Sequence, residues 1–170
     1  GADAEQKNKA LERIALVLQE NKERIMHANA KDMKRSEEEG LPIPLLKRLK
    51  FDEKKIQDTV QGIESLIALD DPVGKTLLST ELDEGLELYR IACPIGVIGV
   101  IFESRPDALV QISSLCLKSG NGVLLKGGAE ARETNRILAD IITEATEAAG
   151  IPSDWIKLLE TRSDVGELLK

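Results

Sequence analysis

The sequence predicts an α/β protein organised around a parallel β-sheet. The first observation is the segment from Ile95 to Phe102, an apolar run of β-branched and small residues that is typical of a strand covered on both faces. The second is a following apolar helical segment and another apolar stretch ending in Lys126-Gly127-Gly128, which complete a βαβ unit. The third is a further alternation, with an amphipathic helix from Glu130 to Ala149 and a short strand from Trp155 to Leu159.

Residues 1–78 are predicted to form an N-terminal helical segment. The chain is helix-forming from Ala4 to about Glu38, and Gly40 and the prolines after it stop the helix. A short helical turn at Leu45 to Leu49 precedes a second long helix, for which Asp52 is a good N-cap. The apolar residues that recur on the inward faces are Leu11, Ile14, Leu18, Ile25 and Met26 in the first helix, and Ile56, Val60, Ile63 and Ile67 in the second.

Residues 79–92 are predicted to form a β-hairpin, because alternating residues flank the turn Asp83-Glu84-Gly85. We expect the hairpin to lie against another part of the protein or a second subunit, and we therefore expect a homo-oligomer. Residues 93–170 would then be the first part of a nucleotide-binding domain, half of a Rossmann-type sheet that ends with a helical turn from Ser163 to Leu169. Since the sequence stops while still helical, we expect it to be part of a longer chain.

The composition limits the partners. A net charge of -7 without a dense basic stripe argues against nucleic acid and against an anionic membrane surface. The longest apolar run, Ile95 to Phe102, is far shorter than the roughly 20 residues of a membrane helix. We expect a cytoplasmic protein.

Neither cysteine nor histidine points to a metal site. Cys93, Cys116 and His27 are the only residues of these types, too few for a disulfide framework or a four-ligand zinc site. We expect both cysteines to be buried and structural, and we expect no metal. The triplet Gly74-Lys75-Thr76 resembles the end of a phosphate-binding P-loop, but Leu69 stands where that loop needs glycine, which favours an ordinary turn.

The two loops that follow the first two strands are the candidate site, because ligands of open parallel sheets collect at the carboxyl ends of the strands. In the loop Lys126-Gly127-Gly128, backbone N–H groups from Gly128 onward could point at an anion with a helix's positive end behind them, although a tight turn is an equal alternative. In the loop from Glu103 to Pro106, Arg105 could clamp a carboxylate or phosphate. The alternative is a surface pair between Glu103 and Arg105.

The block PIGVIGVIFESRPDALVQISSLCLKSGNGVLLKGG, residues 94–128, strongly resembles the γ-glutamyl phosphate reductases, also called glutamate-5-semialdehyde dehydrogenases, including the reductase half of the pyrroline-5-carboxylate synthases. The likeness extends upstream through residues 28–32, 69–74 and 85–90. This family belongs to the aldehyde dehydrogenase superfamily, so the resemblance implies an aldehyde-dehydrogenase-like fold. It also implies NADPH-dependent reduction of L-glutamyl 5-phosphate to L-glutamate 5-semialdehyde and phosphate, a step of proline biosynthesis.

The resemblance implies that the catalytic residue is missing from this chain. In the family, a cysteine in a later catalytic domain, within a CNAMET-like motif, displaces phosphate to form a thioester that then receives hydride. Neither Cys93 nor Cys116 matches that motif, so the nucleophile is expected beyond residue 170 and the chain alone is expected to be inactive.

The same resemblance assigns the candidate site residues. Ser104 or Arg105 is implied to contact the acyl phosphate or its oxyanion. Lys126 matches a superfamily lysine that contacts the adenosine ribose. Ala129 replaces a glutamate that binds both ribose hydroxyls in NAD-using relatives, which predicts a preference for NADP(H). The implied cofactor-binding residues are Glu103, Pro106, Lys126, Gly127, Gly128 and Ala129.

Two other functions remain open from the sequence. One is a non-catalytic Rossmann-like module for assembly or regulation, and the other is a related dehydrogenase acting on a different acyl phosphate or aldehyde.

Overall fold

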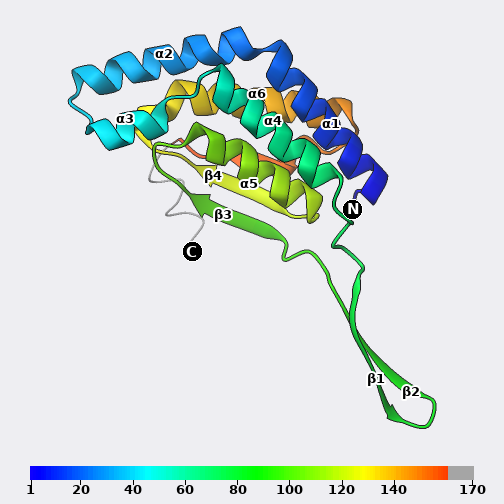
Figure 1. Ribbon diagram of the computed structural model, residues 1–170. Coiled ribbons are helices and arrows are strands. Elements are labelled where there is room, and N and C mark those ends of the chain that lie inside the picture. The colour runs from blue at the N-terminus through cyan, green and yellow to red at the C-terminus, as the bar shows by residue number, and fades with distance from the viewer. Residues whose placement is uncertain (161–170) are drawn as a thin grey trace.

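A computed structural model describes residues 1–160 of the 170-residue chain. Figure 1 shows its helices gathered on one side of a small sheet, with a hairpin projecting away from this body. The sheet has three parallel strands in the order β3-β4-β5, namely Val97–Ile101, Gly122–Lys126 and Ile156–Leu158. The predicted α/β class is therefore confirmed, with helices and a hairpin preceding a parallel sheet. The expected helical turn at Ser163 lies outside the described residues.

The N-terminal helical segment contains four helices rather than the expected two long helices and a short turn. They are α1 (Ala4–Glu20), α2 (Lys22–Glu38), α3 (Ile43–Leu49) and α4 (Glu53–Ile67). The first expected helix is divided at Asn21, whose side-chain amide donates to the carbonyl of Val17 at 2.9 Å and so ends α1. Asp52 caps α4 as predicted, accepting a hydrogen bond from the backbone N–H of Lys55 at 3.1 Å. The apolar faces meet in one core despite the break.

The helices α5 (Pro106–Lys118) and α6 (Arg132–Ala148) connect the parallel strands and pack on the same face of the sheet. The second layer of helices packs on top of them, with α1 against α4 and α6, and α4 against α5. The residues of α6 that were predicted to face inward, Leu138, Ile141, Ile142 and Ala145, are all buried.

The expectation that β3 is covered on both faces is wrong for this chain. Ile98 and Val100 are half-buried under the helices, but Val97 and Ile101 are 69% and 73% exposed. The physical reason is the strand order: when consecutive parallel strands are added in one direction, right-handed crossovers place both connecting helices on the same face. The opposite face of the sheet is therefore open.

The hairpin consists of β1 (Thr76–Asp83) and β2 (Leu86–Ile91), paired antiparallel, and it begins three residues earlier than predicted. All of its residues are exposed, and Figure 1 shows the hairpin projecting away from the helices and the parallel sheet. Gly85 supplies the positive φ of 74° that its turn requires. Gly74-Lys75-Thr76 lies at the base of the hairpin, where the N–H of Gly74 donates to Ala92.

The two cysteines differ in their exposure to solvent. Cys116 is buried in α5 as expected, but Cys93 is exposed, because it lies in the open connection between β2 and β3. Among residues 1–160, no helix combines the length and the apolar character needed to cross a bilayer.

A partly buried ion pair joins the segment before the hairpin to α1. The Nζ of Lys7, which is buried, lies 2.6 Å from Asp71, whose carboxylate also accepts from the N–H of Val73. Burial raises the pKa of Asp71, but the hydrogen bonds from Lys7 and Val73 together with the nearby positive charges outweigh it, so the pKa is lowered below its usual value.

Replacing Asp71 with Asn should therefore destabilise the protein at neutral pH and much less in acid. A carboxyl whose pKa is lowered on folding contributes stability above its unfolded pKa, and this contribution is lost as the pH falls through the folded value. We expect D71N to cost about 1–3 kcal/mol at pH 6, with the difference from wild type shrinking below about pH 4. Thermal unfolding midpoints of D71N and wild type at several pH values measure this difference in stability. The control is D58N, the same charge change at an exposed position of α4; a pH-independent D71N difference would contradict the prediction.

Candidate functional site

The two candidate loops leave the sheet side by side. Because β3 and β4 are adjacent and parallel, with Ile101 opposite Lys126, their carboxyl ends reach the same edge. The backbone N–H of Phe102 donates to the carbonyl of Lys126 at 3.0 Å, so the two segments are still hydrogen-bonded to each other where they leave the sheet. The segment Glu103 to Pro106 and the segment from Lys126 onward therefore share one edge, as strand order predicted.

Ser104 is turned into the protein rather than toward a ligand. Only 1% of its surface is exposed, and its backbone N–H and its Oγ both donate to the same Glu130 carboxylate oxygen, at 2.6 and 2.9 Å. Its φ of +47° is the one positive value at a non-glycine residue within residues 1–160. In this structure the hydroxyl that was expected to contact substrate is occupied by Glu130, which the sequence reasoning missed.

Arg105 is the accessible cation of the same loop. Its side chain is 53% exposed, and its Nη2 lies 2.8 Å from Asp107 in the first turn of α5. The expected surface partner Glu103 is exposed but makes no hydrogen bond or ion pair with Arg105 in the described part of the chain, since Asp107 takes that place. Pro106 begins α5 as predicted and is buried, so it shapes the loop from beneath.

The positions of Gly127 and Gly128 leave no room for a side chain, because side chains of neighbouring residues occupy that space. A Cβ at Gly127 would meet the side-chain amide nitrogen of Asn135, and a Cβ at Gly128 would meet the Glu130 carboxylate. The Nζ of Lys126 donates to the carbonyl of Gly127 at 2.7 Å and is partly buried. Gly127 and Gly128 thus let the loop pack closely onto its own side chains, whatever ligand it also approaches.

The positive end of α6 is already paired with a carboxylate of the protein. Asp32 of α2 is fully buried and accepts hydrogen bonds from the N–H of Glu133 at 3.3 Å, the N–H of Thr134 at 2.8 Å and the Thr134 hydroxyl at 2.7 Å. Arg35 neutralises Asp32 at 2.6 Å. The helix dipole and its first free amides are satisfied from within, so a ligand anion would need Lys126 or the loop instead.

A cavity of about 140 Å³ opens beside the loop. Asn135, which is 2% exposed, contributes to its wall, and the Oδ1 atom of Asn135 has no hydrogen-bond partner among the described residues. The volume is well below the roughly 300–1,000 Å³ of whole-ligand pockets, so it would take one end of a larger molecule. The lining residues are Lys126, Gly127, Gly128, Ala129, Arg132, Asn135, Leu158, Leu159 and Glu160.

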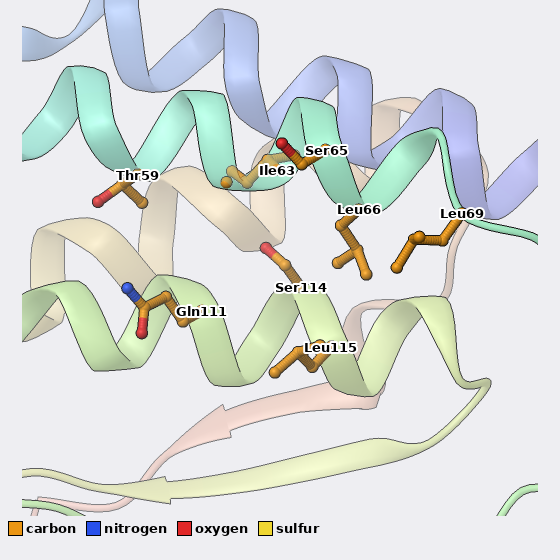
Figure 2. Close-up of a pocket in the computed structure, with 9 residues that line it drawn as sticks. Thr59, Ile63, Ser65, Leu66, Leu69, Gln111, Ser114 and Leu115 are labelled. Atoms are coloured by element: carbon orange, nitrogen blue, oxygen red, sulfur yellow. The ribbon is translucent and has the colours of Figure 1, made fainter.

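A larger hollow of about 390 Å³ lies between α4 and α5, and Figure 2 shows leucine and isoleucine side chains around it. Its lining contains no titratable side chain, so it offers no group for acid–base chemistry or for holding a charge. It is not a candidate for the active site. Within residues 1–160 there is also no cluster of three or more side chains suited to a metal ion.

Comparison with solved structures shows first which fold the chain has. The fold is shared with aldehyde dehydrogenases: an acetylating aldehyde dehydrogenase from Geobacillus thermoglucosidasius superimposes with a TM-score of 0.70 over 99% of this chain and 35% of its own, at 19% identity. No protein-family model matches the chain.

Closer relatives narrow the class. The chain is 75% identical over 169 residues to a γ-glutamyl phosphate reductase of Acetivibrio thermocellus, covering 99% of this chain and 39% of that protein. A relative of the same name from Pelotomaculum thermopropionicum is 73% identical, with the same shares covered. The crystal structure of γ-glutamyl phosphate reductase from Thermotoga maritima has a TM-score of 0.93 at 37% identity, covering 100% of this chain and 42% of that one. The chain belongs to the γ-glutamyl phosphate reductase family, and it spans about two-fifths of the length of these relatives.

Proposed function

We propose that the protein containing this chain reduces L-glutamyl 5-phosphate to L-glutamate 5-semialdehyde and phosphate with NADPH, in the cytoplasm and as a step of proline biosynthesis. This chain would supply the cofactor-binding part. The observation that supports the proposal most directly is the meeting of the Arg105 loop and the Lys126 loop at one edge of the sheet. The names of the relatives supply the substrate and the reaction class.

The reaction needs a nucleophile that this chain does not provide at the site. In the first step a thiolate attacks the acyl carbon, the bond from that carbon to the phosphate oxygen breaks, and a thioester forms. In the second step the thioester is reduced with hydride, which bound NADPH would supply, and the thiolate leaves as the aldehyde forms. Burial raises the pKa of the Cys116 thiol, which makes it a poor nucleophile. Cys93 lies before β3, at the opposite end of the strand from the site. The nucleophile is therefore proposed to lie outside these 170 residues.

The described residues suggest a division of roles. Arg105, exposed at the carboxyl edge, would hold the phosphoryl or carboxylate oxygens of the substrate, because a guanidinium can bind two oxygens at once. The cavity beside Lys126 and Asn135 would take the adenosine end of the cofactor. Gly127, Gly128 and Glu103 would lie along the cofactor, while Pro106 and Ser104 would fix the loop from below.

The activity can be tested in the direction of acyl phosphate formation, which avoids an unstable substrate. The full-length protein with L-glutamate 5-semialdehyde, NADP and inorganic phosphate should produce NADPH only when phosphate is present. Turnover without phosphate would instead indicate a related aldehyde dehydrogenase. No turnover in any direction would favour the non-catalytic module.

We predict that the full-length protein binds NADPH more tightly than NADH, and that A129E weakens NADPH binding by about 10- to 100-fold, or roughly 1.4–2.8 kcal/mol. A carboxylate at this position would repel the 2′-phosphate, whereas Lys126 on the same cavity attracts it. Fluorescence titration of both cofactors measures the change. A129Q, of similar size but neutral, is the matched control; equal affinity of the wild type for NADH and NADPH would contradict the prediction.

We also propose that the protein is a homo-oligomer joined through the hairpin. Its side chains include a group of exposed apolar residues larger than isolated surface residues would explain. They are Leu77, Leu78, Leu82, Leu86, Leu88, Tyr89 and Ile91.

A further inference from the structure

One carboxylate joins the two loops of the site. Glu130 follows the loop after β4, in the short 3-10 helix η1 (Ala129–Ala131), and it accepts both hydrogen bonds of Ser104 in the loop after β3. We propose that Glu130 is a positioning residue for Arg105: it fixes the backbone of Ser104, and this sets the direction in which Arg105 leaves the sheet edge. The inference rests on the proposed function, in which Arg105 contacts the substrate.

The conformation of Ser104 explains why such a link is needed. A φ of +47° is unfavourable for a residue with a side chain, so the surrounding structure has to impose it. The bonds to Glu130 do so at two points of one residue, through the N–H at 2.6 Å and the hydroxyl at 2.9 Å, and both are strengthened by the negative charge of the acceptor. Arg105 follows directly, and the ring of Pro106 restricts the chain on its other side.

Glu130 is itself held in place. Arg35 of α2 donates to the backbone carbonyls of Ala129 and Glu130, at 3.0 and 3.2 Å. The absence of a side chain at Gly128 leaves the space that the carboxylate occupies, since a Cβ there would meet it. The φ of Gly128 is -69°, so alanine at this position would change the packing against Glu130 without straining the backbone.

The test is a cycle of four full-length proteins: wild type, E130A, S104G and the double variant. E130A should lower kcat/KM by about 10- to 100-fold, the range expected when a reacting group is misplaced. The loss should fall on kcat and on the KM for phosphate, with the KM for NADP changed by less than about threefold. S104G should lose less, because glycine adopts a positive φ freely, and the double variant should be no worse than E130A. E130Q, which keeps an acceptor oxygen, should recover most of the activity.

Two further variants separate positioning from other effects. E133A removes a neighbouring glutamate whose carboxylate pairs only with Arg132 among the described residues, and it should leave kcat/KM unchanged. G128A should reproduce the E130A losses in kcat and in the KM for phosphate by displacing the carboxylate, and should add nothing to these two losses in the E130A background. The KM for NADP is compared separately, because Gly128 lies along the cofactor in the proposed function. If the losses multiply when E130A is combined with S104G or with G128A, the inference is overturned.

Thermal unfolding midpoints of wild type, E130A, S104G and the double variant measure the coupling between Ser104 and Glu130 without substrate. If Ser104 and Glu130 are coupled in stability but the wild type has no reductase activity, the proposed function fails and this inference stands. If the wild type is active but the two residues are not coupled, this inference fails and the proposed function stands.

Discussion

Replacing Asp32 with alanine is expected to destabilise the protein by about 3–5 kcal/mol, because it removes a fully buried carboxylate that accepts three hydrogen bonds at the start of α6 and also pairs with the partly exposed Arg35. The variant would leave the Arg35 guanidinium without its carboxylate and the N–H groups of Glu133 and Thr134 without an acceptor. Because Arg35 also holds the carbonyls of Ala129 and Glu130, the loop after Lys126 should loosen as well. Chemical denaturation of the full-length protein measures the loss, and cofactor titration should show weaker binding.

The controls for Asp32 separate its charge from its volume. D32N keeps one acceptor oxygen but places an amide against donors, so it should be less damaging than alanine and still destabilising. Adding formate should partly restore D32A, because a small carboxylate can enter the vacated space between Arg35 and the start of α6. K31A, an exposed change one residue earlier on α2, should have little effect. A D32A protein as stable as K31A would show that the buried network does not hold the loop.

Asp32 also shows where prediction from the sequence stops. Its partners at the start of α6 lie 101 and 102 residues away in the chain, and the local sequence of α2 contains no sign of them. An aspartate in a charged helix is usually interpreted as a solvent-exposed residue. Only the packing of α2 onto α6 shows that the N–H groups of Glu133 and Thr134 at the positive end of α6 are already taken by Asp32.

Features set by local chemistry were predicted well. Asp52 caps α4, Pro106 begins α5, and the apolar spacing of α6 gives its buried face, because each depends on residues only a few positions apart. The meeting of the Arg105 and Lys126 loops followed from strand adjacency alone. The directions of the side chains could not be predicted in this way. The inward direction of Ser104 depends on Glu130, which lies 26 residues later. The exposure of one face of β3 depends on the path of both connections between the parallel strands.

Replacing Arg105 with alanine should lower kcat/KM of the full-length enzyme by about 10²- to 10³-fold, the loss typical of removing one group that stabilises transition-state charge. The fold should be unaffected, since the side chain is about half exposed and its pair with Asp107 lies at the surface, where ion pairs contribute little. R105K should recover only part of the activity, because an ammonium cannot bind two oxygens in the planar geometry of a guanidinium. Steady-state kinetics with varied phosphate, together with thermal unfolding midpoints, measure both effects.

The matched control is D107N, which removes the partner of Arg105 and leaves the guanidinium in place. If Arg105 acts on substrate, D107N should keep most of the activity, and the KM for phosphate should rise in R105A but not in D107N. If Arg105 is only a surface partner of Asp107, the two variants should behave alike, with small changes in stability and none in phosphate dependence. The difference between R105A and D107N therefore decides whether this edge of the sheet receives the substrate.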